Sequence, residues 1–392
     1  MPTNQQLFNT ARAHYEAGRF ERAREVCLTL LKQIPAYGPV FFMLGYCERR
    51  LKNYGGSVDA FARAMKIGGE DPQALYQMGC AWHDLGNLDE AMRWYRMALA
   101  QQPGWAEATS SLGDALVFAS KRKAVECQRA ALRLNPQLTG AALGLAALLF
   151  DRKDPDESRR HLETALAQNP ELAATHYHLA VLDWLSGGDA AAADAAKQLP
   201  AHLADSLDYM RANRTPRTRF FGAAPDVLEF ALGKAGNEGL YLEFGVGFGN
   251  SLRFLAARTD RRIHGFDSFE GVDAARAGTP APGASLIEVP DNVTLHKGRF
   301  SETLPAFARD NSGPVAFAHV DCIGHASARD VFDALGERFV AGTVLVIDRH
   351  VGGDGWRQQG VKAFGEFVTR RCVSYEYLAF GIFSNQAVVR VL

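Results

Sequence analysis

The pattern of apolar and polar positions divides this chain into two halves. Over about the first 200 residues, apolar positions recur with helical spacing, and no segment alternates as a half-buried strand would. From residue 219 onward, helical patterns alternate with short apolar runs, which predicts a parallel sheet with crossover helices. Residues 211–218 (RANRTPRT) are polar, basic and interrupted by proline, which is typical of a linker. We therefore predict a helical domain at 1–210 and an α/β domain at 219–392.

The helical half repeats one unit. Residues 75–103 contain a small residue, Gly79, in a first helix, then a turn at Gly86-Asn87, and then a second helix with Tyr95 on one face. The prolines that close successive units lie 37, 31, 33, 34 and 30 residues apart. This arrangement resembles the tetratricopeptide repeat, whose period is about 34 residues. The resemblance implies an all-α superhelix of about six units with a capping helix at 201–210, because a lone hairpin cannot bury its apolar face.

Arrays of this kind usually bind a protein or peptide on a concave face, which the first helix of each unit lines. By repeat position, the candidate contact residues are Tyr46, Arg49, Tyr76, His83, Tyr177 and Trp184. Ordinary packing or surface positions explain each of them equally well. The repeats therefore imply a partner without identifying it.

Seven apolar runs in the second half are candidate strands. They are 240–244, 263–266, 293–296, 315–320 and 344–347, with 375–380 and 387–391 as a closing antiparallel pair. Four of them end in an acid: Glu243, Asp267, Asp321 and Asp348. Ligands of open α/β sheets bind outside the carboxyl ends of the strands, and acids gathered there are costly without a partner. The pattern predicts a site at that edge, although a helix cap would explain any single acid.

A glycine-rich turn follows the first of these acids. Gly245, Gly247 and Gly249 let the backbone turn tightly and approach a ligand closely. Their spacing is not the pyridine-dinucleotide fingerprint, and the chain has no GxxxxGK[ST] phosphate loop. An acid directly before the turn would repel a pyrophosphate, whereas S-adenosylmethionine carries an ammonium, a sulfonium and no phosphate. We expect Glu243 to hold the ammonium side, in part through water and loop amides, and Asp267 to accept hydrogen bonds from both ribose hydroxyls.

Six ordered segments carry a more specific resemblance. They are LEFGVGFGNSLRFLA, IHGFDSFEG, VTLHKGRFSETLP, VAFAHVDC, GTVLVIDRHVGGDGW and VKAFGEFV. Together they resemble the macrocin O-methyltransferase (TylF-like) family of class I S-adenosylmethionine-dependent methyltransferases, over roughly residues 219–392. The resemblance implies a seven-stranded, doubly wound, Rossmann-like sheet and methyl transfer to oxygen, often a sugar hydroxyl. In several members it also implies a divalent metal bound by acids.

The resemblance also implies cofactor positions. They are Glu243, Gly245, Gly247, Asn250, Ser251, Asp267, Ser268, Glu270 and Asp321. Beside them, we expect Phe269 to cover the adenine and the loop at Gly298-Arg299-Phe300 to close over the base.

Two departures from the family concern the metal. Two residues after Asp321 the family has a further acid, where this chain has Ile323. Directly after Asp348 the family has another acid, where this chain has Arg349. Magnesium is coordinated by several hard oxygen ligands. We predict no catalytic metal, with Asp321 and Asp348 as the ligands if one binds.

A hydroxyl acceptor benefits from a positioned base, and imidazole titrates near neutral pH. We favour His350 or His325 as this base, with Asp321 as the orienting acid. An exposed loop position is a nearly equal alternative for each histidine.

Composition restricts the remaining possibilities. The 392 residues are 47% hydrophobic and 22% charged with a net charge of -1, so nothing favours nucleic acid or an acidic membrane. No apolar run approaches the roughly 20 residues of a membrane span, and the N-terminus has no signal-peptide pattern. Six cysteines without paired spacing predict reduced thiols in a cytoplasmic protein.

Three functions remain open at this stage. The first is an O-methyltransferase of a small molecule or saccharide, whose repeats recruit a partner. The second is a protein or peptide methyltransferase, whose repeat groove presents the substrate. The third is a scaffold that has lost catalysis, against which the intact glycine turn argues.

Overall fold

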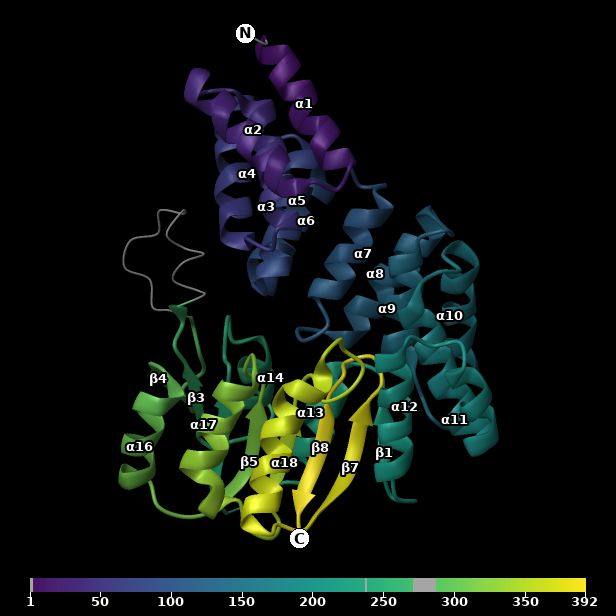
Figure 1. Cartoon of the computed structure of the whole chain (residues 1–392), viewed down its shortest axis with the longest axis vertical. Helices are drawn as coiled ribbons and strands as arrows, with labels where there is room; N and C mark the ends of the chain where they lie inside the picture. Colours follow the sequence, from purple (N-terminus) through teal and green to yellow (C-terminus); the bar gives the residue numbers. More distant parts are fainter. Residues whose placement is uncertain (1–2, 237, 271–286) are drawn as a thin grey trace. The chain divides into compact units, whose positions relative to one another are not determined.

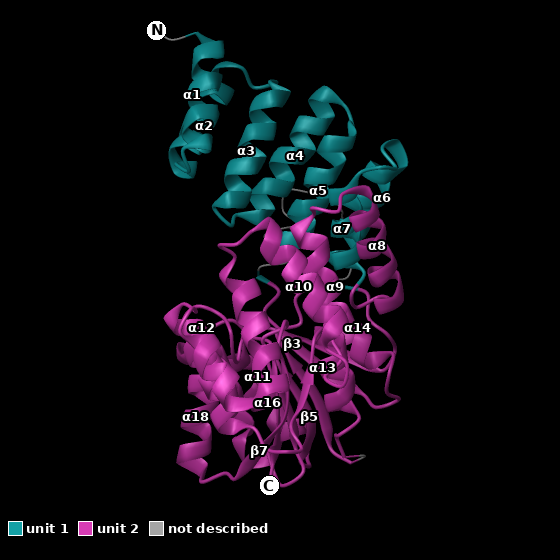
Figure 2. Cartoon of the chain, turned by 90° about the vertical axis from the view of Figure 1, so that its right-hand side faces the viewer, with its two compact units in different colours: residues 1–116, 270–287 teal, residues 117–269, 288–392 magenta. Residues whose placement is uncertain are grey.

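The computed structural model describes residues 3–236, 238–270 and 287–392. They form two compact units (Figure 2). The first unit consists of residues 1–116 and 270–287, and the second of residues 117–269 and 288–392. Among the described residues, no helix has both the length and the apolar character needed to cross a membrane.

The first unit is a series of antiparallel helix hairpins. Its helices are α1 (Asn4–Glu16), α2 (Phe20–Gln33), α3 (Gly38–Arg50), α4 (Tyr54–Gly68), α5 (Pro72–Leu85), α6 (Leu88–Gln101) and α7 (Ala106–Ala115). The hairpins explain why small residues recur in the sequence. A β-carbon on Gly45 would come within 2.7 Å of the Phe61 ring, and one on Gly79 within 2.6 Å of the Tyr95 ring. Only glycine therefore lets these two helix pairs cross so closely.

The second unit begins with the remaining helices of the array. They are α8 (Lys121–Leu134), α9 (Thr139–Leu149), α10 (Asp156–Gln168), α11 (Ala173–Ala196) and α12 (Ala201–Asn213). Gly188, with φ 79°, interrupts α11 and divides it into two helical segments, which makes the last hairpin. Helices α1–α12 confirm the predicted helical repeat array. The helix predicted as a cap is α12, and it continues to Asn213.

The α/β half is an eight-stranded sheet in the order β1-β7-β8-β6-β5-β2-β3-β4 (Figure 1). The strands are β1 (Arg219–Phe221), β2 (Leu240–Phe244), β3 (Ile263–Asp267), β4 (Val293–Lys297), β5 (Val315–Val320), β6 (Val344–Ile347), β7 (Tyr375–Gly381) and β8 (Ala387–Val391). Only β8 runs antiparallel to its neighbours, β6 and β7. This confirms the predicted Rossmann-like fold. The sequence predicts seven of these strands and not β1, which is three residues long and pairs in parallel with β7.

Helices cover both faces of the sheet. They are α13 (Ala224–Leu232), α14 (Asn250–Ala256), α16 (Phe300–Asp310), α17 (His325–Leu335) and α18 (Gly360–Arg371). The chain moves outward from β2 through β3 to β4, then returns to β5 on the other side of β2. With right-handed crossovers, α16, α17 and α18 lie side by side on one face, and α13 and α14 on the other (Figure 1). The winding therefore reverses between β2 and β5, where open α/β sheets bind ligands.

Candidate functional site

The four strand-terminal acids meet at this reversal point. Glu243 in β2 is in register with His319 in β5, and Asp267 is the last residue of β3. Asp321 and Asp348 directly follow β5 and β6. The amide of Asp321 donates to the carbonyl of the last residue of β2, and the amide of Asp348 to that of the last residue of β5, so both continue the sheet hydrogen bonding. Parallel strands end at the same edge, so four side chains distant in sequence are brought together.

The glycine turn is fixed to the ends of the neighbouring strands. The amide of Gly245 donates to the carbonyl of Phe266 at 2.9 Å, and that of Gly247 to Asp267 Oδ2 at 2.8 Å. Gly245, Gly247 and Gly249 all have positive φ, which glycine adopts without strain. A β-carbon on Gly245 would overlap the carbonyl oxygen of Asp321, whereas one on Gly247 would meet no atom of the described residues within 4 Å. The turn is thus packed on its inner side and open at Gly247.

Asp267 binds the glycine turn with one carboxylate oxygen and the loop after β3 with the other. Oδ2 accepts from Gly247, and Oδ1 accepts from the amide of Phe269 at 2.8 Å. Its carbonyl accepts from Gly298 at 3.0 Å, which ties the predicted closing loop to the same residue. Each carboxylate oxygen keeps a second lone pair for another donor. Phe269 is fully buried at φ 57°, so its ring packs inside the domain.

Glu243 is fully buried beneath the turn. Its Oε1 accepts from the hydroxyl of Ser251 in α14 at 2.6 Å, while the nearest cationic group to Oε2 in the described part of the chain is the His319 ring, at 3.5 Å. The other predicted cofactor positions lie along the same edge: Asn250 begins α14, Ser268 follows β3, and Arg299 caps α16. Glu270 is exposed and borders residues 271–286, which lie outside the described structure.

His319 is absent from the sequence-based predictions, yet it lies at the centre of the acids. Its ring is 1% exposed, with Nδ1 3.5 Å from Glu243 Oε2 and Nε2 3.0 Å from Asp348 Oδ1. Gln386 donates to the same oxygen of Asp348 at 2.7 Å. The available sequence signal was one polar residue inside the apolar strand VAFAHV, since a buried polar group requires a partner.

Burial and the neighbouring charges shift the pKa values of His319 and Asp321. Burial alone lowers the pKa of His319, but the charge and hydrogen bond of Asp348 and the nearby Glu243 raise it well above the usual range. The imidazole is therefore a cation at neutral pH. Burial and the charge of Asp348 raise the pKa of Asp321 to about 7, although His319 and Arg349 oppose this. Asp321 is thus a carboxyl group that changes charge near neutral pH.

Asp321 is the accessible acid of this group. Its side chain is 29% exposed and accepts a hydrogen bond from Arg349 Nη1 at 3.0 Å. Arg349 has φ 52°, an unfavourable backbone conformation for a residue with a β-carbon, and this turn directs the chain away from the end of β6. Ile323, which follows in the loop after β5, is 79% exposed.

The donor set does not fit a catalytic magnesium ion. His319, Asp321 and Asp348 each place one potential ligand atom within 4.8 Å of the others. However, His319 offers a nitrogen ligand and already lies against Glu243 and Asp348, and the Arg349 guanidinium already brings positive charge to Asp321. Magnesium also prefers an octahedron of oxygen atoms. Two cationic side chains therefore balance the acids of this site.

The two histidines predicted as bases lie in different surroundings. His350 is fully buried, and its Nε2 lies 2.8 Å from the Tyr377 hydroxyl. Burial lowers the pKa of His350 to about 3, so it is a neutral group enclosed by protein. His325 begins α17, and its Nε2 lies 2.8 Å from Glu366 of α18. Neither histidine is hydrogen-bonded to the four strand-terminal acids.

The residues predicted to bind a partner fall into a buried group and a partly exposed group. Tyr177 and Trp184 are 2% and 1% exposed, so the prediction that they line a binding face is wrong. The Trp184 ring packs edge-on against the ring of Phe220 in β1, with 5.4 Å between the ring centroids, because α11 shares its hydrophobic core with the sheet. The other four candidates are partly exposed in the first unit and stay predictions: Tyr46, Arg49, Tyr76 and His83.

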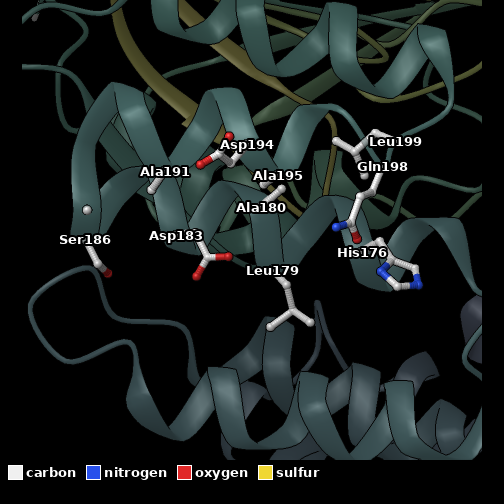
Figure 3. A pocket seen from close by; sticks show the side chains of 11 residues that line it. His176, Leu179, Ala180, Asp183, Ser186, Ala191, Asp194, Ala195, Gln198 and Leu199 are labelled. Atoms are coloured by element: carbon white, nitrogen blue, oxygen red, sulfur yellow. The ribbon is translucent and has the colours of Figure 1, made fainter.

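Helix α11 borders an open pocket of about 590 Å³ (Figure 3). His176, Leu179 and Asp183 line it from the first segment of α11, and Asp194 and Gln198 from beyond Gly188. The acids carry ion pairs, Asp183 with Arg159 at 2.7 Å and Asp194 with Lys197 at 2.7 Å. The pocket therefore offers no excess charge of one sign.

Comparison with known proteins separates the two halves in the same way. Residues 242–349 match the model of a methyltransferase domain, and residues 8–74 and 72–105 match models of the tetratricopeptide repeat. The chain thus joins tetratricopeptide repeats to a methyltransferase domain. The matched methyltransferase segment contains all four strand-terminal acids, the glycine turn and His319.

Three similar proteins each cover between 41% and 53% of this chain. The Arabidopsis thaliana protein CTR9 homolog is 25% identical over 169 residues, which are 41% of this chain and 16% of that protein. Among solved structures, a tetratricopeptide repeat protein from Parabacteroides merdae is 20% identical, covering 53% of this chain and 86% of that one, with a TM-score of 0.44. Pseudomonas aeruginosa pilF is 17% identical, covering 53% and 96%, with a TM-score of 0.45.

Proposed function

We propose that this protein is an S-adenosylmethionine-dependent O-methyltransferase related to the TylF-like family, with its methyltransferase domain at 219–392 and its repeat array at 1–210. The observation that carries the proposal is the pair of acids that flank the glycine turn. Glu243 is buried beneath the turn, with Ser251 on Oε1 and the His319 ring 3.5 Å from Oε2, and Asp267 accepts the amides of Gly247 and Phe269 on its two oxygens. A carboxylate beside the turn that can still accept hydrogen bonds suits a phosphate-free ligand with hydroxyl donors.

These residues fit the cofactor in distinct roles. The free lone pairs of Asp267 would accept the two ribose hydroxyls, and the amides near Gly247 would face the amino-acid part. Glu243 would provide negative charge through Ser251 and the turn, because Ser251 and His319 already lie against its carboxylate. When bound, S-adenosylmethionine supplies an electrophilic methyl group on a sulfonium.

We assign the base to Asp321 instead of His350 or His325. A base must reach the proton of the acceptor hydroxyl. Asp321 is partly exposed at the carboxyl edge, and its pKa of about 7 suits proton transfer near neutral pH. His350 is enclosed by protein, and His325 is engaged by Glu366. Asp321 would take the hydroxyl proton as the O–CH₃ bond forms and the S–CH₃ bond breaks, with Arg349 orienting its carboxylate.

The acceptor that we favour is a small molecule or saccharide, with the repeats recruiting a partner. One observation supports the second candidate, methylation of a protein or peptide. Helices α8–α12 share a compact unit with the methyltransferase sheet, and α9–α12 share its hydrophobic core, so a polypeptide bound there would lie on the same compact unit as the site.

Calorimetric titration with S-adenosylmethionine in the presence of a chelator tests the cofactor. We expect the wild type to bind and Asp267→Ala to weaken binding at least tenfold, because both ribose bonds and the turn amides lose their acceptor. Asp260→Ala, an exposed acid before β3, is the matched control and should bind as the wild type does. Absence of wild-type binding would support the scaffold hypothesis.

Methyl-labelled S-adenosylmethionine and a cell extract then distinguish the acceptors. Label in small molecules supports the first candidate, and label in protein supports the second.

A further inference from the structure

Helix α12 belongs to the helical array, yet its side chains bind the segment that leaves the candidate active site. We propose that Tyr209 of α12 is a positioning residue for methyl transfer, which acts through His350 and Tyr377 on the segment that carries Asp348 and Arg349. This inference rests on the proposed function of the sheet edge.

Tyr209 is the partly buried member of a three-residue network whose other members, His350 and Tyr377, are buried. Its hydroxyl lies 2.5 Å from the hydroxyl of Tyr377 in β7 and 3.4 Å from Nε2 of His350. His350 Nε2 lies 2.8 Å from the same Tyr377 hydroxyl. A neutral imidazole and two phenols can each donate and accept, and such networks are strong when water is excluded. The network thereby joins α12, β7 and the segment after β6.

Two further side chains of α12 bind the same segment. The hydroxyl of Ser206 accepts from the amide of Gly352 at 2.6 Å. Asp205 accepts two hydrogen bonds from Arg357, at 2.6 and 2.7 Å. Tyr209 lies one turn further along the helix, where its ring packs edge-on against Trp356 at 5.0 Å. One face of α12 therefore holds residues 350–357 at successive points.

The bound segment begins inside the site. Arg349, with φ 52°, lies between Asp348 and His350, and a non-glycine residue in this conformation is strained and persists only where its surroundings hold it. His319 and Gln386 hold Asp348 on one side. On the other side, His350 is held by the Asn385 carbonyl and by the network of Tyr209 and Tyr377. If that second anchor loosens, Arg349 can relax and its hydrogen bond to Asp321 is lost.

The cofactor residues do not depend on this anchor. Glu243 and Asp267 lie on β2 and β3, and their partners are the glycine turn, Ser251 and His319. A change at Tyr209 should therefore slow transfer to the acceptor without weakening the cofactor. A change that only destabilised the domain would reduce both the rate of transfer and the affinity for the cofactor. Measuring the two quantities therefore separates a positioning role from structural support.

The test compares Tyr209→Phe and Ser206→Ala with the wild-type full-length chain. Tyr241→Phe is the matched control, because it also removes one tyrosine hydrogen bond in this unit, to the carbonyl of Gly236 at 2.7 Å. Three quantities are measured: calorimetric affinity for S-adenosylmethionine, label transfer into a cell extract, and amide hydrogen exchange of residues 349–352.

We expect Tyr209→Phe to lower label transfer about tenfold or more, with affinity within twofold of wild type and faster exchange at 349–352. The control should change none of the three. Unchanged transfer, an equal loss of affinity, or unchanged exchange at 349–352 would overturn the inference. If the wild type fails to bind S-adenosylmethionine, the proposed function fails instead, and the exchange measurement still decides whether α12 holds the segment.

Discussion

Replacing His319 by leucine should destabilise the methyltransferase sheet. The ring of His319 is 1% exposed, and it provides positive charge to Glu243 and Asp348, which are 0% and 18% exposed. Removing one partner from a buried ion pair typically costs about 3–5 kcal/mol, because the remaining charge is left uncompensated. Glu243 keeps Ser251, and Asp348 keeps Gln386, so we expect the lower end of this range, about 3 kcal/mol.

The stability difference between the wild type and His319→Leu should depend on pH. The folded-state pKa of His319 lies well above the ordinary value of 6.5. Its contribution to the free energy of unfolding is therefore fully present below pH 6.5 and is lost as the pH rises through the folded-state pKa. The difference between the wild type and His319→Leu should accordingly be largest at about pH 5–6.5 and shrink toward alkaline pH.

Amide hydrogen exchange in β2 and β5 measures the local free energy of opening in the intact chain. His325→Leu is the control, since this histidine is paired with Glu366 at a partly exposed position and should cost less than about 1 kcal/mol. A loss below about 1 kcal/mol for His319→Leu, or a loss independent of pH, would show that His319 is not the buried cation of this site.

Three further predictions concern the glycine turn, the base and the metal. Gly245→Ala should lower the free energy of urea unfolding by about 2 kcal/mol or more and reduce cofactor binding, because a β-carbon there overlaps the carbonyl of Asp321. Gly313→Ala is the control for backbone strain alone, because Gly313 has a positive φ but its β-carbon would meet no described atom within 4 Å. Equal losses of stability in the two variants would contradict the overlap. The rate of label transfer should rise with pH around an apparent pKa near 7 as Asp321 deprotonates, and Asp321→Asn should abolish this rise; a rise that survives the substitution assigns the base elsewhere. Chelators should leave turnover unchanged, whereas turnover that requires magnesium would contradict the charge balance by Arg349 and His319.

Local patterns were sufficient to predict most of the fold. Helical periodicity and recurring small residues predict the array, because hairpins repeat the same packing at each crossing, as at Gly45 and Gly79. The seven longer strands are short runs rich in apolar residues, whereas β1 is too short to form such a pattern. The four acids were predicted to share an edge, since parallel strands place their carboxyl ends together.

The site depended on contacts that no local pattern contains. His319 lies in an ordinary apolar strand, and only strand register places it opposite Glu243. His350 follows Asp348 in sequence and so resembled an active-site base. The left-handed turn at Arg349 instead sends it toward Tyr377 and Tyr209, which are 27 and 141 residues away in the chain.

Helix α12 shows the same division. Its helical pattern follows from the spacing of apolar residues within the segment itself. That pattern is the same wherever the segment packs in the fold. Its contacts through Ser206 and Tyr209 to the segment after β6 require that the array and the sheet share one core. Short-range periodicity therefore determined the elements of this protein, and long-range packing determined which side chains surround Asp321, because burial and charge partners exist only once distant segments meet.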